Sequence, residues 1–314
     1  MIVLHPNVAN FPQAEEILPL LEIGLKMHDF IINLVHLLYQ MSHNARCVLF
    51  PSFSAKRYKL INLVIGKVMS LKLNRVTTVE GISLCLDKCD SLALSYNRVY
   101  EPEETLLIKN TIKSGMRVID IGANIGYYTT IFSKLTQDGF VHSFEPDNQN
   151  FKILQKNCQL NKCRNVKLHN RAAGNCDSLQ KLYLSDTNHG DHRSYPVGDN
   201  RDFIEIKMVT IDNFLKSESN FDFIKMDIQG FEMNALEGIK NTLLNSKPML
   251  LMEIWPEALI KNNTHPSSII AFLRKANYNI YDVENLEECI SLESTGRWLD
   301  SIKNHTNIYC TKKT

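Results

Sequence analysis

From residue 77 onwards the chain alternates between short apolar runs and segments whose apolar residues recur at helical spacing. Continuous apolar runs are typical of strands buried on both faces, and recurrence every three or four residues is typical of helices. The expected strands are 116–121, 140–144, 166–173, 221–228, 248–255, 278–283 and 307–311. The expected helices are 103–113, 127–135, 147–160, 267–276 and one that follows residue 230. This alternation predicts an α/β fold with a doubly wound sheet.

Two other patterns predict antiparallel structure. Residues 77–94 read as a β-hairpin whose second strand is followed by a turn at 87–90 and a further strand segment, SLALS. Residues 181–184 and 203–209 predict an antiparallel pair around the polar excursion 185–201.

Residues 1–76 differ from the rest and are expected to form a helical extension, which leaves 77–314 as the main domain. Helices are expected at 15–41 and 57–73. From 56 to 75 there are six basic residues and no acidic one. This basic segment fits a helix on an anionic membrane surface, but a cap packed on the main domain or on a partner subunit is the preferred interpretation. The apolar stretch 17–39 carries charged residues, so a spanning helix is not expected.

Composition narrows the class of protein. The chain has 44% hydrophobic and 22% charged residues and a formal net charge of +1, which gives no general attraction to nucleic acids. Its eight cysteines form no CxxC pair, so reduced thiols in a cytoplasmic protein are expected rather than zinc ligands or disulfides. No metal is expected. The oligomeric state is left open, a homo-oligomer included.

The strand–turn–helix–strand unit at 115–146 contains a glycine turn, Asp120-Ile-Gly122-Ala-Asn124-Ile-Gly126. Such a unit by itself indicates only a nucleotide-like cofactor. A dinucleotide fingerprint would have glycine where Asn124 stands. Asp120 would also repel a pyrophosphate, and no Lys or Arg between it and Tyr128 offsets that charge.

S-adenosylmethionine suits the same turn because it carries a sulfonium and an ammonium group and no phosphate. Asp120 can attract these charges, and the helix start at Asn124–Tyr127 can receive the methionyl carboxylate. Glu145, at the end of the next strand, is placed to accept hydrogen bonds from both ribose hydroxyls. Taken singly, each carboxylate could be a helix cap or a solvated strand end, but their combination favours this cofactor.

The chain resembles the FkbM-type family of S-adenosylmethionine-dependent methyltransferases in the segments GMRVIDIGANIGYYTTIFSKL, VHSFEPDNQNFKILQKN, RAAG, TIDNF, FIKMDIQGFE and MLLMEIW. The resemblance covers about residues 84–255. It implies a class I methyltransferase fold, Rossmann-like, with a mostly parallel seven-stranded sheet whose last strand is antiparallel. It also implies O-methylation of sugars, glycolipids or secondary metabolites, and it places Ala172 of RAAG among the cofactor-binding residues. One departure is Gln229, where the family often has glutamate.

The acceptor is expected at the carboxyl ends of the strands. There, Asp227 is a candidate cofactor-binding and catalytic residue near the transferable methyl group, although it could instead cap the next helix. Glu253 is a second catalytic candidate. Trp255 offers an aromatic plane for a sugar face, with a core tryptophan as the alternative.

The loop Asn188-His-Gly-Asp-His-Arg193 is rich in reactive side chains. His192 is the expected general base, with Asp191 orienting it or contacting a substrate hydroxyl. Arg193 could bind an anionic group and His189 the substrate. A polar surface loop is the plain alternative, and a metal site formed by the histidines and the aspartate is a less favoured one.

The leading functional hypothesis is therefore an O-methyltransferase acting on a small-molecule or glycan acceptor. Methylation of RNA or protein is the near alternative, although no basic patch rich in aromatic residues supports nucleic acid. A different class is a scaffold protein that keeps the fold without turnover. Peripheral membrane contact through 56–75 is a further expectation.

Overall fold

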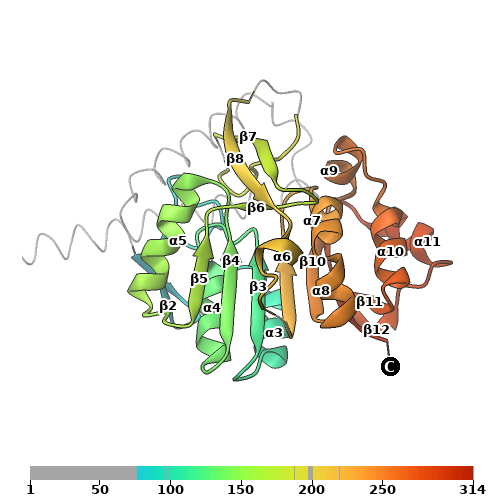
Figure 1. Ribbon diagram of the computed structural model, residues 1–314, viewed down its shortest axis with the longest axis horizontal. Coiled ribbons are helices and arrows are strands. Elements are labelled where there is room, and N and C mark those ends of the chain that lie inside the picture. The colour runs from blue at the N-terminus through green and yellow to red at the C-terminus, as the bar shows by residue number, and fades with distance from the viewer. Residues whose placement is uncertain are drawn as a thin grey trace, which may run out of the picture. The chain divides into compact units, whose positions relative to one another are not determined.

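The computed structural model describes residues 76–95, 97, 99–186, 188–196, 201–218 and 220–313 (Figure 1). The helices expected at 15–41 and 57–73 and the basic segment 56–75 lie outside this range, as does most of the extension 1–76. They stay predictions, as does the domain boundary at 76/77. In the part of the chain that is described, no helix is long and apolar enough to cross a membrane.

An eight-stranded sheet forms the centre of the described structure. From edge to edge its strands are β12 (Asn285–Cys289), β11 (Tyr278–Asp282), β13 (Thr306–Lys312), β10 (Met249–Ile254), β9 (Phe223–Met226), β3 (Arg117–Ile121), β4 (Phe140–Phe144) and β5 (Val166–His169). Strands β10, β9, β3, β4 and β5 pair in parallel. The last strand, β13, lies antiparallel between β10 and β11. The predicted class I methyltransferase fold is confirmed, with β12 as an unpredicted eighth strand at the edge.

Helices cover both faces of this sheet, and the order of apolar residues explains why. The helices are α3 (Pro102–Thr111), α4 (Tyr127–Thr136), α5 (Asn148–Leu160), α6 (Ile211–Phe214), α7 (Glu232–Gly238), α8 (Lys240–Asn245), α9 (Pro256–Lys261), α10 (Pro266–Lys275) and α11 (Thr295–Ser301). Val118 and Phe223 pack in the core with α3 and α4. Their chain neighbours Ile119 and Ile224 pack in the other core, with α7, α8 and α10. Successive side chains of a strand point to opposite faces, so both must be apolar when both faces are covered.

The predicted strand 166–173 is divided between two sheets. After β5 the chain turns, and β6 (Ala172–Ala173) pairs with β8 (Phe203–Val209), which also pairs with β7 (Ser178–Tyr183). The turn is held by Asn170, whose side-chain amide donates to the backbone carbonyls of Glu145 and Pro146 at 2.9 and 3.0 Å. This small second sheet lies beyond the carboxyl end of the main sheet (Figure 1).

The hairpin is confirmed as β1 (Val76–Val79) and β2 (Ile82–Cys85), but the strand segment SLALS is wrong. Turns replace it because Asp87 and Asp90 capture backbone N–H groups that a strand would offer to a neighbour. Asp87 accepts from the backbone N–H groups of Cys89 and Ser91, and Asp90 accepts from those of Leu94 and Ser95. The single helix expected after residue 230 is two helices, α7 and α8.

Candidate active site

A cleft of about 380 Å³ opens at the carboxyl ends of β3, β4, β9 and β10. The four strand-end carboxylates that the sequence singles out all line it: Asp120, Glu145, Asp227 and Glu253. Parallel strands bring residues of distant sequence to one edge of the sheet, which is where ligands bind in this architecture. Further walls come from the glycine turn, β6, the loop at 188–193 and the segments around residues 91, 101 and 305.

The glycine turn follows β3 directly and begins α4. Gly122, Asn124 and Gly126 all have positive φ, at 83°, 49° and 91°. The N–H groups of Gly122 and Ala123 both donate to the carbonyl of Phe144 at 3.0 Å, which ties the turn to the end of β4. This conformation is accessible to glycine and tolerated by asparagine, so the spacing of these residues reflects the backbone path.

Asp120 is fully buried at the end of β3 and keeps one oxygen unused. The hydroxyl of Thr129 on α4 donates to its Oδ2 at 2.6 Å. Its Oδ1 is buried and has no hydrogen-bond partner among the described residues. Burial raises the pKa of Asp120, against the attraction of Lys225. A buried acceptor that faces a cleft is matched to a ligand cation, and the ammonium group of S-adenosylmethionine fits it.

Glu145 is held at the end of β4 by two backbone donors. The N–H groups of Asn124 and Asp147 donate to its two oxygens at 2.8 and 2.9 Å. Burial raises the pKa of Glu145 to about 8. Because each carboxylate oxygen can accept a second hydrogen bond, the geometry still fits a pair of ribose hydroxyls.

The two other expected cofactor-binding residues, Ala172 and Tyr127, differ from each other in how they meet the cleft. Ala172 lines the cleft from β6. The ring of Tyr127 packs edge-on against Tyr100 and Tyr128, and its hydroxyl lies 3.3 Å from that of Thr105. Tyr127 therefore offers a cofactor mainly its backbone N–H in the first turn of α4.

The 188–193 loop is tied down over the cleft by partners from distant segments. The N–H of His189 donates to the hydroxyl of Ser91 at 2.7 Å, and its carbonyl accepts from the amide of Asn150 on α5 at 3.0 Å. The rings of His189 and His192 lie 5.6 Å apart. These bonds bring both histidines to the cleft wall.

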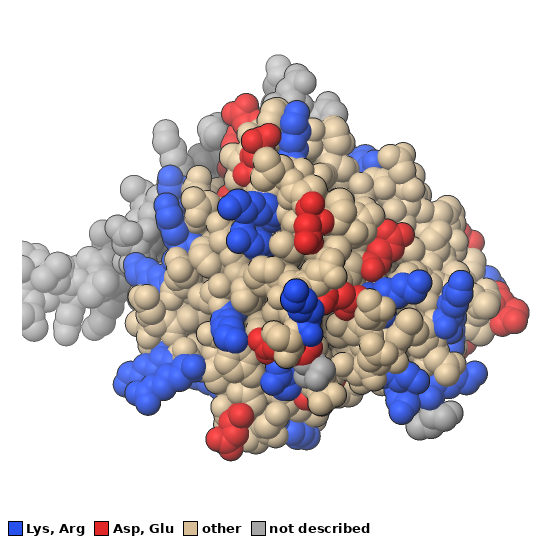
Figure 2. All heavy atoms as spheres, in the orientation of Figure 1, with Lys and Arg blue, Asp and Glu red and all other residues tan. Residues whose placement is uncertain are grey.

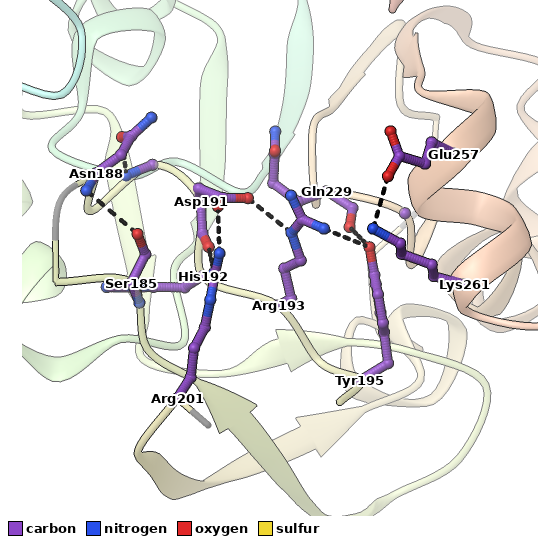
Figure 3. A network of polar contacts seen from close by, with 12 residues as sticks. Ser185, Asn188, Asp191, His192, Arg193, Tyr195, Arg201, Gln229, Glu257 and Lys261 are labelled. Carbon is purple, nitrogen blue, oxygen red and sulfur yellow. Dashed lines mark hydrogen bonds and ion pairs between the residues drawn. The ribbon is translucent and has the colours of Figure 1, made fainter. Parts of the chain in front are cut away.

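Asp191 and Arg193 bind each other rather than the groups expected from the sequence (Figure 3). Arg193 Nε donates to Asp191 Oδ1 at 2.7 Å, and Arg201 donates to Asp191 Oδ2 at 2.8 Å. The guanidinium of Arg193 is buried and lies 4.5 Å from the centre of the Trp255 ring. Both oxygens of Asp191 accept from arginines, and the charge of Arg193 is paired with Asp191. The orienting role of Asp191 and the anion-binding role of Arg193 stay predictions.

His192 has one ring nitrogen committed to the backbone. Its Nδ1 accepts the N–H of Ser185 at 3.0 Å, and burial lowers the pKa of the ring. A neutral imidazole that accepts at Nδ1 carries its proton on Nε2, so the remaining nitrogen is a donor. This geometry makes Nε2 of His192 a hydrogen-bond donor, and its role as general base stays a prediction. In the described residues no group of three or more His, Cys, Asp or Glu side chains is arranged to hold a metal.

The opposite wall carries a network of hydrogen bonds centred on Gln229. Its side-chain Nε2 donates to Asp227 Oδ1 at 2.8 Å and to Glu253 Oε2 at 3.0 Å. Lys225 Nζ lies 3.3 Å from Asp227 Oδ2. Burial raises the pKa of Glu253 well above its usual value, and the nearby charge of Asp227 adds to this. At this departure from the family pattern the amide donates to both carboxylates, which an ionised glutamate cannot do.

We expect Gln229→Glu to make the unliganded protein increasingly unstable as the pH rises. The new carboxyl group would lie between Asp227 and Glu253, so its folded-state pKa would be raised above the unfolded value. A raised carboxyl pKa leaves stability intact at low pH and removes it as the pH rises. Melting temperatures from pH 5.5 to 8 should therefore show a deficit relative to the wild type that grows with pH. A deficit that is constant over this range would contradict the network.

Sequence reasoning missed Glu101, the residue just before α3. It lines the cleft, has a left-handed backbone with φ 44°, and accepts the hydroxyl of Tyr128 at 2.8 Å. Burial raises the pKa of Glu101 to about 7. Nothing in the local sequence marks this residue, because a glutamate before a proline at a helix start is ordinary.

Comparison with known proteins adds the following. The methyltransferase FkbM domain matches residues 120–280. No curated protein sequence is a significant match. The chain is similar to a methyltransferase FkbM structure from Methylobacillus flagellatus KT, with 16% identity and a TM-score of 0.41 over 81% of this chain and 60% of that one. It is also similar to precorrin-6y C5,15-methyltransferase from Geobacter metallireducens GS-15, with 12% identity and a TM-score of 0.41 over 68% and 89% of the two chains. A third similar structure is a SAM-dependent methyltransferase from Aquifex aeolicus, with 15% identity and a TM-score of 0.38 over 66% and 88%.

Proposed function

The chain belongs to the FkbM methyltransferase family, and we propose that it methylates a hydroxyl oxygen of a sugar, a glycolipid or a secondary metabolite. The protein is an S-adenosylmethionine-dependent methyltransferase. When bound, the cofactor supplies an electrophilic methyl group. The protein's part is then to position the acceptor oxygen in line with that group and to accept its proton.

Four groups of this chain are suited to hold the cofactor. Asp120 Oδ1 can accept the ammonium group, and Glu145 the ribose hydroxyls. The N–H groups at the start of α4 can receive the methionyl carboxylate, because a helix N-terminus carries partial positive charge. Ala172, the remaining expected cofactor-binding residue, lines the same cleft from β6.

The acceptor proposal is carried by one observation: two carboxylates share the amide of one glutamine in the cleft that the Trp255 side chain also lines. Asp227 and Glu253 share the amide of Gln229, and Trp255 follows Glu253 at the end of β10. A sugar commonly presents hydroxyl donors at its rim and C–H groups on its face, which match carboxylates and an indole ring respectively.

Glu253 is the proposed proton acceptor. Asp227 already binds Lys225 and Gln229 through its two oxygens, whereas Glu253 Oε1 lies 4.0 Å from His305 Nε2 and accepts no hydrogen bond from the described residues. Burial makes Glu253 a stronger base than an ordinary carboxylate, and a cationic ligand favours its ionised form again. His192 would donate a hydrogen bond to the cofactor or the acceptor.

The experiment is a mass screen of glycans and hydroxylated small molecules with methyl-labelled cofactor. We expect one labelled methyl group on an acceptor oxygen. Glu253→Gln should keep cofactor affinity and lose about 100-fold or more in turnover, the usual order for a catalytic acid or base. The matched control is Glu257→Gln, an exposed residue of α9 paired with Lys261 (Figure 3).

Two results would redirect the proposal. If His192→Ala loses turnover while Glu253→Gln keeps it, the histidine is the base. Label found only in RNA or protein would replace the glycan or small-molecule acceptor. On the face shown in Figure 2, basic and acidic side chains are interspersed, which does not favour a nucleic acid. Cofactor binding without transfer to any acceptor class would favour a scaffold role.

A further inference from the structure

We propose that Glu101 belongs to the acceptor site, and that the carboxylates around Lys225 select a hydroxyl-rich acceptor without carboxylate, phosphate or sulfate groups. This inference rests on the proposed function and narrows it. Glu101 would contact acceptor hydroxyls beside the position where the methyl group is transferred.

Lys225 is the centre of this cluster, which joins two sides of the cleft. It lies 3.3 Å from Asp227, and its ammonium is 4.7 Å from the centre of the Tyr128 ring. The hydroxyl of Tyr128 donates to Glu101. Asp120 is the strand neighbour of Lys225 in the pairing of β3 with β9. The carboxylates of Asp227, Glu101 and Asp120 hold the pKa of Lys225 above its usual range despite its burial.

The charges of the cluster do not cancel. Asp120, Glu101, Asp227 and Glu253 can carry four negative charges against the one positive charge of Lys225. Arg193, whose guanidinium lies 4.5 Å from the centre of the Trp255 ring, binds Asp191 together with Arg201. S-adenosylmethionine brings one net positive charge, so up to two negative charges of this cluster stay unbalanced when all four carboxyl groups are ionised.

An anionic acceptor would add to that excess, and a neutral or amino-bearing one would not. Charges removed from water must be paired or neutralised, and burial indeed raises the pKa of Glu101 to about 7. Hydroxyl groups of an acceptor donate hydrogen bonds to carboxylates without adding charge to the site. An ammonium group of an acceptor is also attracted to the carboxylates by its positive charge.

The placement of Glu101 is not explained by helix capping. It stands at the N-cap of α3, yet its side chain makes no capping hydrogen bond. Its left-handed backbone turns the carboxylate towards the cleft instead. A non-glycine residue in this conformation is strained, and such strain persists where the surrounding structure imposes it, often at functional sites.

The test compares three matched probes on the protein saturated with S-adenosylhomocysteine: methyl glucoside, methyl glucosaminide and methyl glucuronide. Affinities are measured by ligand-observed NMR titration. We expect the glucoside and the glucosaminide to bind, and the glucuronide to bind at least about tenfold more weakly. Added salt should narrow this gap only slightly, because the site is buried.

Variants identify the residue responsible. Glu101→Gln removes one negative charge at constant size and should reduce the affinity difference between the glucoside and the glucuronide severalfold. The control Glu103→Gln, at an exposed residue of α3, should leave this affinity difference unchanged. Cofactor affinity and melting temperature, measured in parallel, separate this effect from loss of fold. If Glu101→Gln leaves the gap as in the wild type, Glu101 is not part of the acceptor site.

Three further outcomes decide the rest. Equal or tighter binding of the glucuronide overturns the charge selection, as does the failure of all three probes to bind. In either case, methyl transfer to a larger glycan would leave the proposed function standing. Transfer only to RNA or protein would overturn the proposed function itself and the inference with it.

Discussion

We expect Asp120→Asn to abolish measurable binding of S-adenosylmethionine while the protein stays folded. The substitution keeps an oxygen to accept from Thr129 and removes the charge opposite the cofactor's ammonium. Two unit charges about 4 Å apart interact by about 4 kcal/mol at a partly screened site, or roughly three powers of ten in affinity. Titration calorimetry measures this loss directly.

The stability of the same variant distinguishes a lost contact from a damaged fold. Because burial raises the pKa of Asp120, the ionised form destabilises the unliganded protein at neutral pH. The asparagine variant should therefore melt at the same or a higher temperature at pH 7. Asp138→Asn, on an exposed loop, is the matched control and should change neither quantity. Cofactor affinity within threefold of the wild type in Asp120→Asn would contradict the assignment.

Gly122→Ala is expected to lower the free energy of unfolding by about 2 to 4 kcal/mol. Gly122 has φ +83°, and a Cβ placed there would lie 2.0 Å from the backbone carbonyl oxygen of Asp227 and 3.0 Å from the side chain of Ile228. Backbone atoms cannot move aside as a flexible side chain can, so the ends of β3 and β9 would be forced apart. Chemical denaturation measures the loss, and cofactor affinity should fall with it.

Gly115→Ala separates the two causes of that loss. Gly115 has nearly the same φ, +85°, but a Cβ there meets no atom within 4 Å. Its substitution should cost only the conformational term, about 1 kcal/mol. If Gly122→Ala and Gly115→Ala lowered the free energy of unfolding equally, the close approach of the glycine turn to the end of β9 would not be the reason that residue 122 is glycine.

Local features of the sequence determine most of the cofactor side. Continuous apolar runs predict buried strands because both faces of the sheet are covered, and 140–144 is found as β4 with the same bounds. Gly122 and Gly126 are required because the backbone has a positive φ at both residues, which glycine adopts without strain. Asp120 and Glu145 end parallel strands, so their meeting at one cleft follows from the sheet itself.

The positions of the residues proposed to bind the acceptor depend on contacts between segments far apart in the chain, and such contacts cannot be read from a local sequence pattern. Asp191 pairs with Arg201, 10 residues further along the chain, as well as with Arg193. Glu101 lines the cleft, where it accepts the hydroxyl of Tyr128 from another element and lies within electrostatic range of Lys225. The end of a strand is specified by where an apolar run stops and by the spacing of apolar residues, and both can be read from the local sequence. The partner of a polar side chain is chosen by the geometry of the folded chain, because several carboxylates compete for few cations and only tertiary structure decides which of them meet.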